Sequence, residues 1–274
     1  MGYMEIIILA IIQGLTEFFP VSSSGHLVVA QDLLGISSPG VVIEVVLHLG
    51  TLLSVIFVFW RDIVGLWRGF LSLLTNPRGT RPVPREVSTY RRLIWLLIVG
   101  IIPTAAMGLF LEPMFDRLFD SVIAVGFALL ITGIVLFLIS RARAGRRSLE
   151  RISFVDALVV GLAQGCAITP GLSRSGMTIS SALGRGLTRD AATRYSFLLS
   201  LPAIAGAAIL KFGDIYAAGI EGGLAPVLLI GFLVAALAGI VAIKLLIRVL
   251  NSSKLQYFAY YVWVLGLVII WRAR

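Results

Sequence analysis

The sequence predicts an all-α polytopic membrane protein built as an inverted-topology repeat, each half holding one re-entrant helix pair and three transmembrane helices. Three observations lead to this fold class. Apolar residues make up 58% of the 274-residue chain and charged residues only 14%, a composition suited to a lipid environment. Basic residues gather in short loops between apolar runs. Two motifs rich in Gly, Pro and Ser recur at equivalent places in the two halves.

Six apolar segments are long enough, or nearly long enough, to cross a bilayer, which takes about 20 residues. They are 41–60, 93–111, 121–140, 190–210, 224–247 and 257–271. We expect a single integral-membrane domain over 1–274, with repeat 1 at about 1–140 and repeat 2 at about 153–274.

Charges in the connecting loops predict the orientation. Loops 61–92 and 141–151 are rich in arginine, which places them in the cytoplasm. Segment 112–120 is acidic and should face outside, as should the turn that holds Asp214 and Glu221. Because the net charge of +9 follows from this topology, nucleic acid is not expected as a partner.

The two remaining segments, 1–40 and 153–189, must each begin and end on one side of the membrane. Their apolar flanks, 4–12 and 154–163, are too short to cross, and a break rich in Gly, Pro and Ser follows each. This pattern is typical of a helix pair that enters the bilayer and returns. The first pair starts outside and the second inside, so the two halves have opposite orientation.

The breaks carry the two recurring motifs, "QGLTEFFPVSSSGHL" at 13–27 and "QGCAITPGLSRSGMT" at 164–178. Re-entrant pairs from opposite faces meet near the bilayer centre, where irregular backbone is stable only inside protein or around a cavity. Charged side chains at that depth are costly and generally functional. We therefore expect Glu17, His26 and Arg174 to outline one polar site.

The second motif has the residue types of an anion site. A Pro-Gly turn leads into Ser173, Ser175 and Thr178, whose hydroxyls could cap a helix start and hold an anion beside free backbone N–H groups. The Arg174 guanidinium offers a bidentate donor for phosphate oxygens. An arginine that pairs with Glu17 to join the two repeats is an alternative that the sequence leaves open.

The first motif offers proton-transfer groups and a hydroxyl. Glu17 could act as a general base or as an oxygen ligand for Mg²⁺ or Ca²⁺, and His26 is suited to proton transfer near neutral pH. Ser22, Ser23 and Ser24 each supply a hydroxyl that such a base could activate, and Ser23 is the favoured one. Helix capping and close packing are the alternative role of these serines.

Three smaller features accompany the motifs. His48 and Glu44 lie one turn apart in segment 41–60, where they either line the same cavity or form a plain buried pair. "GLAQG" at 161–165 has the close-packing G-x-x-x-G spacing, which serves either an internal contact or a homodimer. Cys166 is the only cysteine, so no disulfide or thiolate metal cluster is expected.

The two motifs resemble the E/Q-x-x-x-E and P-G-x-S-R-S-x-x-T signatures of the bacitracin-resistance family of undecaprenyl-diphosphate phosphatases. The resemblance is carried by Gln13–Glu17 with the following "PVSSSGH", by "PGLSRSGMT" at 170–178 and by "RYSFLLSLPAIAGA" at 194–207. It implies an interdigitated inverted repeat. It also implies a membrane hydrolase that removes the terminal phosphate of the C55 isoprenoid diphosphate carrier, which recycles the carrier for peptidoglycan and other envelope polymers and confers bacitracin resistance.

The resemblance carries over five site residues by motif, Glu17, His26, Ser173, Arg174 and Thr178, and the residue types of the two motifs add the other members of the expected site. The catalytic set is Glu17, Ser23, His26 and Arg174. The substrate-binding set is Gln13, Ser22, Ser173, Arg174, Ser175 and Thr178. A divalent cation, Mg²⁺ or Ca²⁺, is implied as cofactor, with Glu17 as its ligand. Gln13 stands where the better-known family form has glutamate, and because a neutral amide is a weaker cation ligand, a two-carboxylate metal site is in doubt.

The expected partners are a long-chain isoprenyl diphosphate lipid and membrane lipids, in a bacterial inner membrane, with the cavity facing the outer side. Attack on the terminal phosphorus would come from Ser23 or from water, with His26 managing the proton. A transporter or flippase of an isoprenoid phosphate or another anion is the main rival, because inverted repeats with broken helices are common among transporters. A structural subunit is disfavoured by the ionisable groups at the motif centres.

Overall fold

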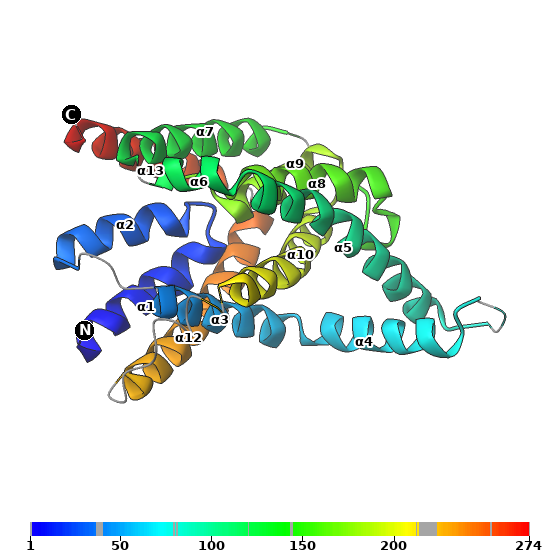
Figure 1. Cartoon of the computed structure of the whole chain (residues 1–274). Coiled ribbons are helices and arrows are strands. Elements are labelled where there is room, and N and C mark those ends of the chain that lie inside the picture. The colour runs from blue at the N-terminus through cyan, green and yellow to red at the C-terminus, as the bar shows by residue number, and fades with distance from the viewer. Residues whose placement is uncertain are drawn as a thin grey trace.

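The computed structural model describes residues 2–36, 41–78, 80, 82–119, 121–142, 145–211, 213, 224–252 and 254–273. Within these ranges the chain is helical, with no strand beyond one isolated bridge between Arg147 and Leu187, which confirms the predicted all-α class (Figure 1). The loop residues Asp120, Asp214 and Glu221 of the orientation argument lie outside the described residues.

The helices of the first half are α1 (Tyr3–Phe18), α2 (Ser23–Leu34), α3 (Val41–Val58), α4 (Trp60–Thr75), α5 (Arg85–Phe110), α6 (Glu112–Phe119) and α7 (Val122–Ser140). A short 3₁₀ turn, η1 (Leu149–Arg151), precedes the second half. Its helices are α8 (Phe154–Cys166), α9 (Arg174–Gly184), α10 (Arg189–Leu210), α12 (Ala225–Asn251) and α13 (Gln256–Arg272).

Four helices of the described chain, α5, α7, α10 and α12, have the length and apolar character of membrane spans. They confirm four of the predicted segments. A fifth span arises if α3 and α4 are counted together, although the two helices meet at an 83° bend. Helix α13 covers the sixth predicted segment with 17 residues. The helices of the two motif regions, α1, α2, α8 and α9, are 16 residues or shorter, too short to cross a bilayer.

The prediction that residues 61–92 form a loop is wrong for most of this range. Helix α4 fills its first half and α5 begins already at Arg85, so only residues 76–84 connect them. Arginine is a good helix former, and a basic segment at the membrane surface can therefore stay helical. The chain leaves the helix where Pro77, Pro82 and Pro84 follow in close succession, since proline lacks the backbone N–H that a helix needs.

A buried polar cluster fixes α4 against its neighbours. The Asp62 carboxylate, 5% exposed, accepts a hydrogen bond from the Tyr90 hydroxyl at 3.0 Å and one from Arg194 Nε at 3.3 Å. Because these groups belong to α4, α5 and α10, the cluster holds three helices together at the arginine-rich end. A buried carboxylate without such partners would be strongly destabilising.

The first helix of each motif region packs against a helix of the other half. Helix α1 lies along α12, and α8 lies along α5. Glycines permit both approaches: a Cβ added at Gly14 would lie 2.7 Å from the Ala235 carbonyl oxygen, and one added at Gly161 would lie 2.0 Å from the Gly100 carbonyl oxygen. The G-x-x-x-G spacing at 161–165 therefore serves an internal helix contact.

The start of α8 is anchored to the basic segment before it. Asp156, which is fully buried, caps the helix with Ser153 and accepts hydrogen bonds from Arg147 and Arg185. Burial raises the pKa of the Asp156 carboxyl, but the hydrogen bonds from Arg147, Ser153 and Arg185 outweigh it and hold that pKa well below its usual range. This network fixes the helix that leads into the second motif.

Candidate active site

The first motif runs on the end of α1 and the start of α2. Gln13 and Glu17 lie one turn apart on α1, both buried, and the Gln13 side-chain amide donates to Glu17 Oε2 at 2.9 Å. The sequence predicted the break immediately after Ile12, but the helix continues to Phe18. Helix α1 continues through Gly14, where it packs closely against α12. It ends at Phe18 because Pro20 disfavours helical backbone at the residue before it.

A tight reversal then starts α2. Ser22 has φ of +68°, a left-handed conformation that is uncommon for a residue other than glycine. Its buried hydroxyl lies 3.1 Å from the Ser24 hydroxyl. The reversal places Ser23 at the first position of α2, where its hydroxyl donates to Glu17 Oε2 at 2.8 Å.

The second motif has a similar reversal between α8 and α9. Gly171 has φ of +88°, and a Cβ there would lie 2.3 Å from the Val125 carbonyl oxygen of α7, so this position requires glycine. Ser173 then caps α9, accepting from the Gly176 amide at 3.2 Å, while its own amide donates to the Thr132 hydroxyl at 3.1 Å. These contacts place Arg174 at the first residue of α9.

The two motifs meet, as the sequence predicted. Arg174 donates to Glu17 Oε1 in a largely buried ion pair, with 19% of the arginine side chain and 5% of the glutamate side chain exposed. The Ser175 hydroxyl donates to the Phe19 carbonyl at 3.1 Å, which adds a second link between the reversals. The Glu17–Arg174 pair that the sequence left open therefore exists in the structure.

His48 of α3 joins this cluster. Its Nε2 lies 3.7 Å from Glu17 Oε2, the same oxygen that accepts from Ser23. Its Nδ1 donates to the Glu44 backbone carbonyl at 2.8 Å. His48 therefore contacts the main chain of Glu44 and not its carboxylate. The sequence left open whether His48 lines the site or only pairs with Glu44, and the structure places it beside Glu17. Glu17 is thus surrounded by side chains from α1, α2, α3 and α9.

Two predicted residues lie apart from this cluster. The His26 ring donates through Nδ1 to the Ser22 carbonyl at 2.8 Å, and its Nε2 lies 2.7 Å from the Tyr261 hydroxyl of α13. Both ring nitrogens are therefore engaged away from Ser23 and Glu17. Thr178 is buried, donates to the Arg174 carbonyl at 2.8 Å and contacts the Ser196 hydroxyl. In this geometry Thr178 supports the backbone at Arg174 and packs α9 against α10.

The groups around Glu17 do not fit a cation held by the protein alone. Gln13, Ser23 and Arg174 all donate to its carboxylate, whereas Mg²⁺ and Ca²⁺ need several oxygen ligands. The Gln13 side-chain oxygen is buried and has no hydrogen-bond partner, which leaves one acceptor next to one carboxylate. Across the described residues, no group of three or more His, Cys, Asp or Glu side chains could hold a metal ion.

The fold and the site together define a class: an α-helical membrane protein in which two helix reversals bring a carboxylate, a serine hydroxyl and an arginine together in its interior. The family model described as Bacitracin resistance protein BacA matches residues 6–268. This chain belongs to that family.

Curated relatives agree over the full length. An undecaprenyl-diphosphatase of Halothermothrix orenii is 44% identical over 270 residues, which cover 98% of each chain. One of Alkaliphilus metalliredigens is 41% identical over 271 residues, again 98% of each chain. One of Carboxydothermus hydrogenoformans is 42% identical over 275 residues, 98% of this chain and 97% of the relative.

Proposed function

We propose that this protein is an integral-membrane phosphatase that hydrolyses undecaprenyl diphosphate to undecaprenyl phosphate and inorganic phosphate. The observation that carries the proposal is the meeting of Glu17, Ser23 and Arg174 at the two reversals in a chain of this family. The full-length relatives that bear the name undecaprenyl-diphosphatase support the substrate. Recycling of the lipid carrier for cell-wall synthesis and resistance to bacitracin follow from this activity.

The residues divide the chemistry in the following way. The isoprenoid chain stays in lipid while the diphosphate reaches the buried cluster. Arg174 and the backbone N–H groups at the start of α9 hold the terminal phosphate, and Ser173 fixes that helix start. The arginine also stabilises the charge that develops on the phosphoryl oxygens. Ser175, Thr178, Ser22 and Gln13 hold the backbone and the Glu17 carboxylate in position.

Glu17 takes the proton of the attacking hydroxyl. Ser23 already donates to Glu17 Oε2 at 2.8 Å, within the range for proton transfer. In the serine route, Ser23 Oγ bonds to the terminal phosphorus, the bridging P–O bond breaks and undecaprenyl phosphate leaves; water then hydrolyses the phosphoserine to inorganic phosphate. In the direct route, a water in the place of the Ser23 hydroxyl attacks the phosphorus in one step, and Glu17 takes its proton.

Two further features belong to this proposal. A divalent cation, Mg²⁺ or Ca²⁺, would be held mainly by the diphosphate oxygens with Glu17 as the one carboxylate beside it, and it would neutralise phosphate charge, since the side chains around Glu17 do not themselves form a cation site. The two halves form an inverted repeat with re-entrant pairs α1–α2 and α8–α9, which is supported by the exchange of α1 onto α12 and of α8 onto α5. The site opens to the outer side of the bacterial inner membrane.

The test is a product assay on the detergent-purified protein with a long-chain isoprenyl diphosphate. We expect equal release of inorganic phosphate and of the lipid monophosphate, and we expect a chelator to stop both. A transporter would bind the lipid diphosphate and move it across liposome membranes without breaking a bond. Binding and movement with no phosphate released under any divalent cation would contradict the proposal.

A further inference from the structure

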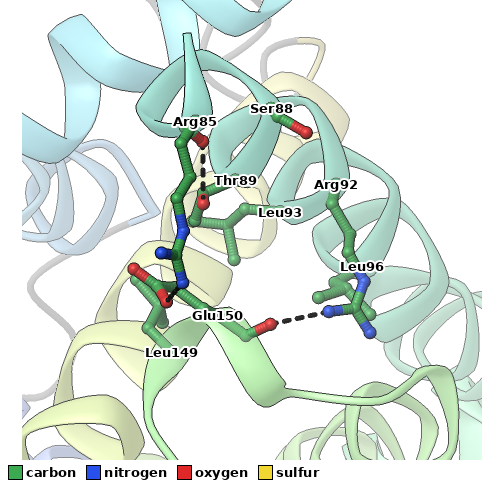
Figure 2. A pocket seen from close by; sticks show the side chains of 8 residues that line it. All are labelled: Arg85, Ser88, Thr89, Arg92, Leu93, Leu96, Leu149 and Glu150. Carbon is green, nitrogen blue, oxygen red and sulfur yellow. Dashed lines mark hydrogen bonds and ion pairs between the residues drawn. The ribbon is translucent and has the colours of Figure 1, made fainter.

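A polar cavity lies away from the Glu17 cluster, at the arginine-rich end of the molecule. Its volume is about 250 Å³, and it is formed by one face of α5 and the η1 turn. Arg85, Ser88, Thr89 and Arg92 line its polar part, and Leu93 and Leu96 line its apolar part. Figure 2 shows the two arginines reaching toward Glu150 from either side.

Arg92 is held in place before any ligand binds. Its guanidinium donates to the backbone carbonyls of Glu150 and Ile152, both at 2.7 Å. A guanidinium carries five N–H donors, so donors remain for a ligand. Two backbone carbonyls carry no net charge, and the positive charge of Arg92 is therefore not neutralised by these bonds.

Arg85 is readily available to an anion. Its only described ion pair is with Glu150 at 3.4 Å, and 89% of the arginine side chain and 53% of the glutamate side chain are exposed. Such exposed pairs contribute about 0–1 kcal/mol. A phosphate group that enters between the two arginines meets two positive charges and one weakly held carboxylate, with the Ser88 and Thr89 side chains beside it.

The cavity has the composition of a headgroup site at a membrane surface. Its polar part belongs to the first two turns of α5, and the buried side chains of Leu93 and Leu96, on the same face of the helix, form its apolar part. Trp95, half exposed on α5, marks the interfacial level at which tryptophan is enriched. Arginine-rich loops face the cytoplasmic leaflet, whose anionic lipids bind basic pockets of this kind.

We propose that this cavity binds the phosphate group of an anionic phospholipid of the cytoplasmic leaflet. Arg92 and Arg85 bind the phosphate oxygens, and Glu150 moves aside as its pair with Arg85 opens. The site is separate from hydrolysis, so it neither requires nor excludes the activity proposed above.

Thermal melting of the full-length protein in detergent micelles tests this site. The micelles contain phosphatidylglycerol or phosphatidylcholine with the same acyl chains, and in a third series inorganic phosphate is added to the buffer instead. For each additive we compare the concentration needed to raise the melting temperature by a fixed amount. We expect phosphatidylglycerol to stabilise the protein more than the other two. Arg85→Gln should weaken this effect about tenfold, the value of a charge-assisted hydrogen bond. Ser88→Glu, which adds a carboxylate to the cavity, should weaken it at least as much.

The matched control is Arg68→Gln, which removes an exposed arginine of α4 outside the cavity and should retain the full response. Equal losses in Arg68→Gln and Arg85→Gln would show that general surface charge attracts the lipid, which overturns the proposal. Equal stabilisation by inorganic phosphate would overturn the lipid as ligand. Arg92 is left unchanged, because its bonds to the 150–152 backbone make a folding defect the expected outcome.

Discussion

Replacing Gly161 by alanine perturbs the contact that positions the second motif. The added methyl group would lie 2.0 Å from the Gly100 carbonyl oxygen, whereas ordinary van der Waals contact begins at 3.4 Å. The backbones of α5 and α8 must therefore move apart by about 1.4 Å. The obstacle is backbone rather than a flexible side chain, so the strain has no local relief.

The expected cost is that of overpacking, about 1–3 kcal/mol of unfolding free energy. For a chain of this size each kcal/mol lowers the melting temperature by about 2–4 °C, which predicts a fall of roughly 2–12 °C. Helix α8 also leads to Arg174, and a displacement of about 1 Å at a positioning group can lower a rate by about a hundredfold. We therefore expect a large loss of turnover, by up to about a hundredfold, in a protein that still folds and melts only a few degrees lower.

Gly206→Ala is the matched control, because a Cβ at Gly206 in α10 would meet nothing within 4 Å. It should melt at the wild-type temperature or slightly above, since alanine favours a helix over glycine by up to about 1 kcal/mol. The assays are thermal melting and phosphate release. Wild-type melting and turnover in Gly161→Ala would refute the close helix approach. If Gly161→Ala melted at the wild-type temperature but changed from a dimer to a monomer, the G-x-x-x-G spacing at 161–165 would serve a homodimer contact instead.

Three further predictions concern stability, the nucleophile and the periphery of the site. Asp156→Asn should lower the unfolding free energy by roughly 1.5–3 kcal/mol at neutral pH, because it removes the charge of the buried carboxylate to which Arg147 and Arg185 donate hydrogen bonds. The lowered pKa of Asp156 means that this difference persists above the unfolded-state pKa of about 3.9. It should shrink as the pH falls toward the folded-state pKa, and pH-dependent melting that showed it growing would contradict the network. Ser23→Ala should lower phosphate release at least about a hundredfold while lipid diphosphate binding persists; wild-type turnover would leave water as the nucleophile. Tyr261→Phe, which removes the partner of His26 Nε2, should change turnover by no more than about tenfold, the value of one neutral hydrogen bond. A loss of a thousandfold in the same assay would place Tyr261 in the catalytic machinery.

The sequence predicted the all-α class and most of the candidate membrane spans because apolar runs and arginine-rich connections are strong, independent signals in membrane proteins. It also predicted that Glu17 and Arg174 belong to one polar site, because re-entrant pairs from opposite faces meet near the bilayer centre, and it left their direct ion pair open as an alternative. It failed over 61–92, where basic composition was taken as a loop. Charge indicates which side of the membrane a segment faces, but it does not exclude a helix.

The side-chain directions could not be predicted in the same way. His26 is three residues from Ser23 in the sequence, yet its ring bonds to Ser22 and Tyr261. His48 is distant in the sequence and reaches Glu17. Such contacts depend on how α2, α3 and α13 pack, which periodicity does not determine. A histidine in an apolar span, one turn after an acidic residue, was the only signal for His48.

The central claim is that Arg174, brought to Glu17 by the two reversals, holds the phosphate that is removed. The most direct measurement is inorganic phosphate release from a long-chain isoprenyl diphosphate by Arg174→Ala, compared with wild type and with Arg117→Ala, which removes an exposed arginine of α6. All three proteins are assayed at equal folded amounts. The account predicts that Arg117→Ala matches wild type and that Arg174→Ala releases almost no phosphate. Release by Arg174→Ala at the wild-type rate would contradict it.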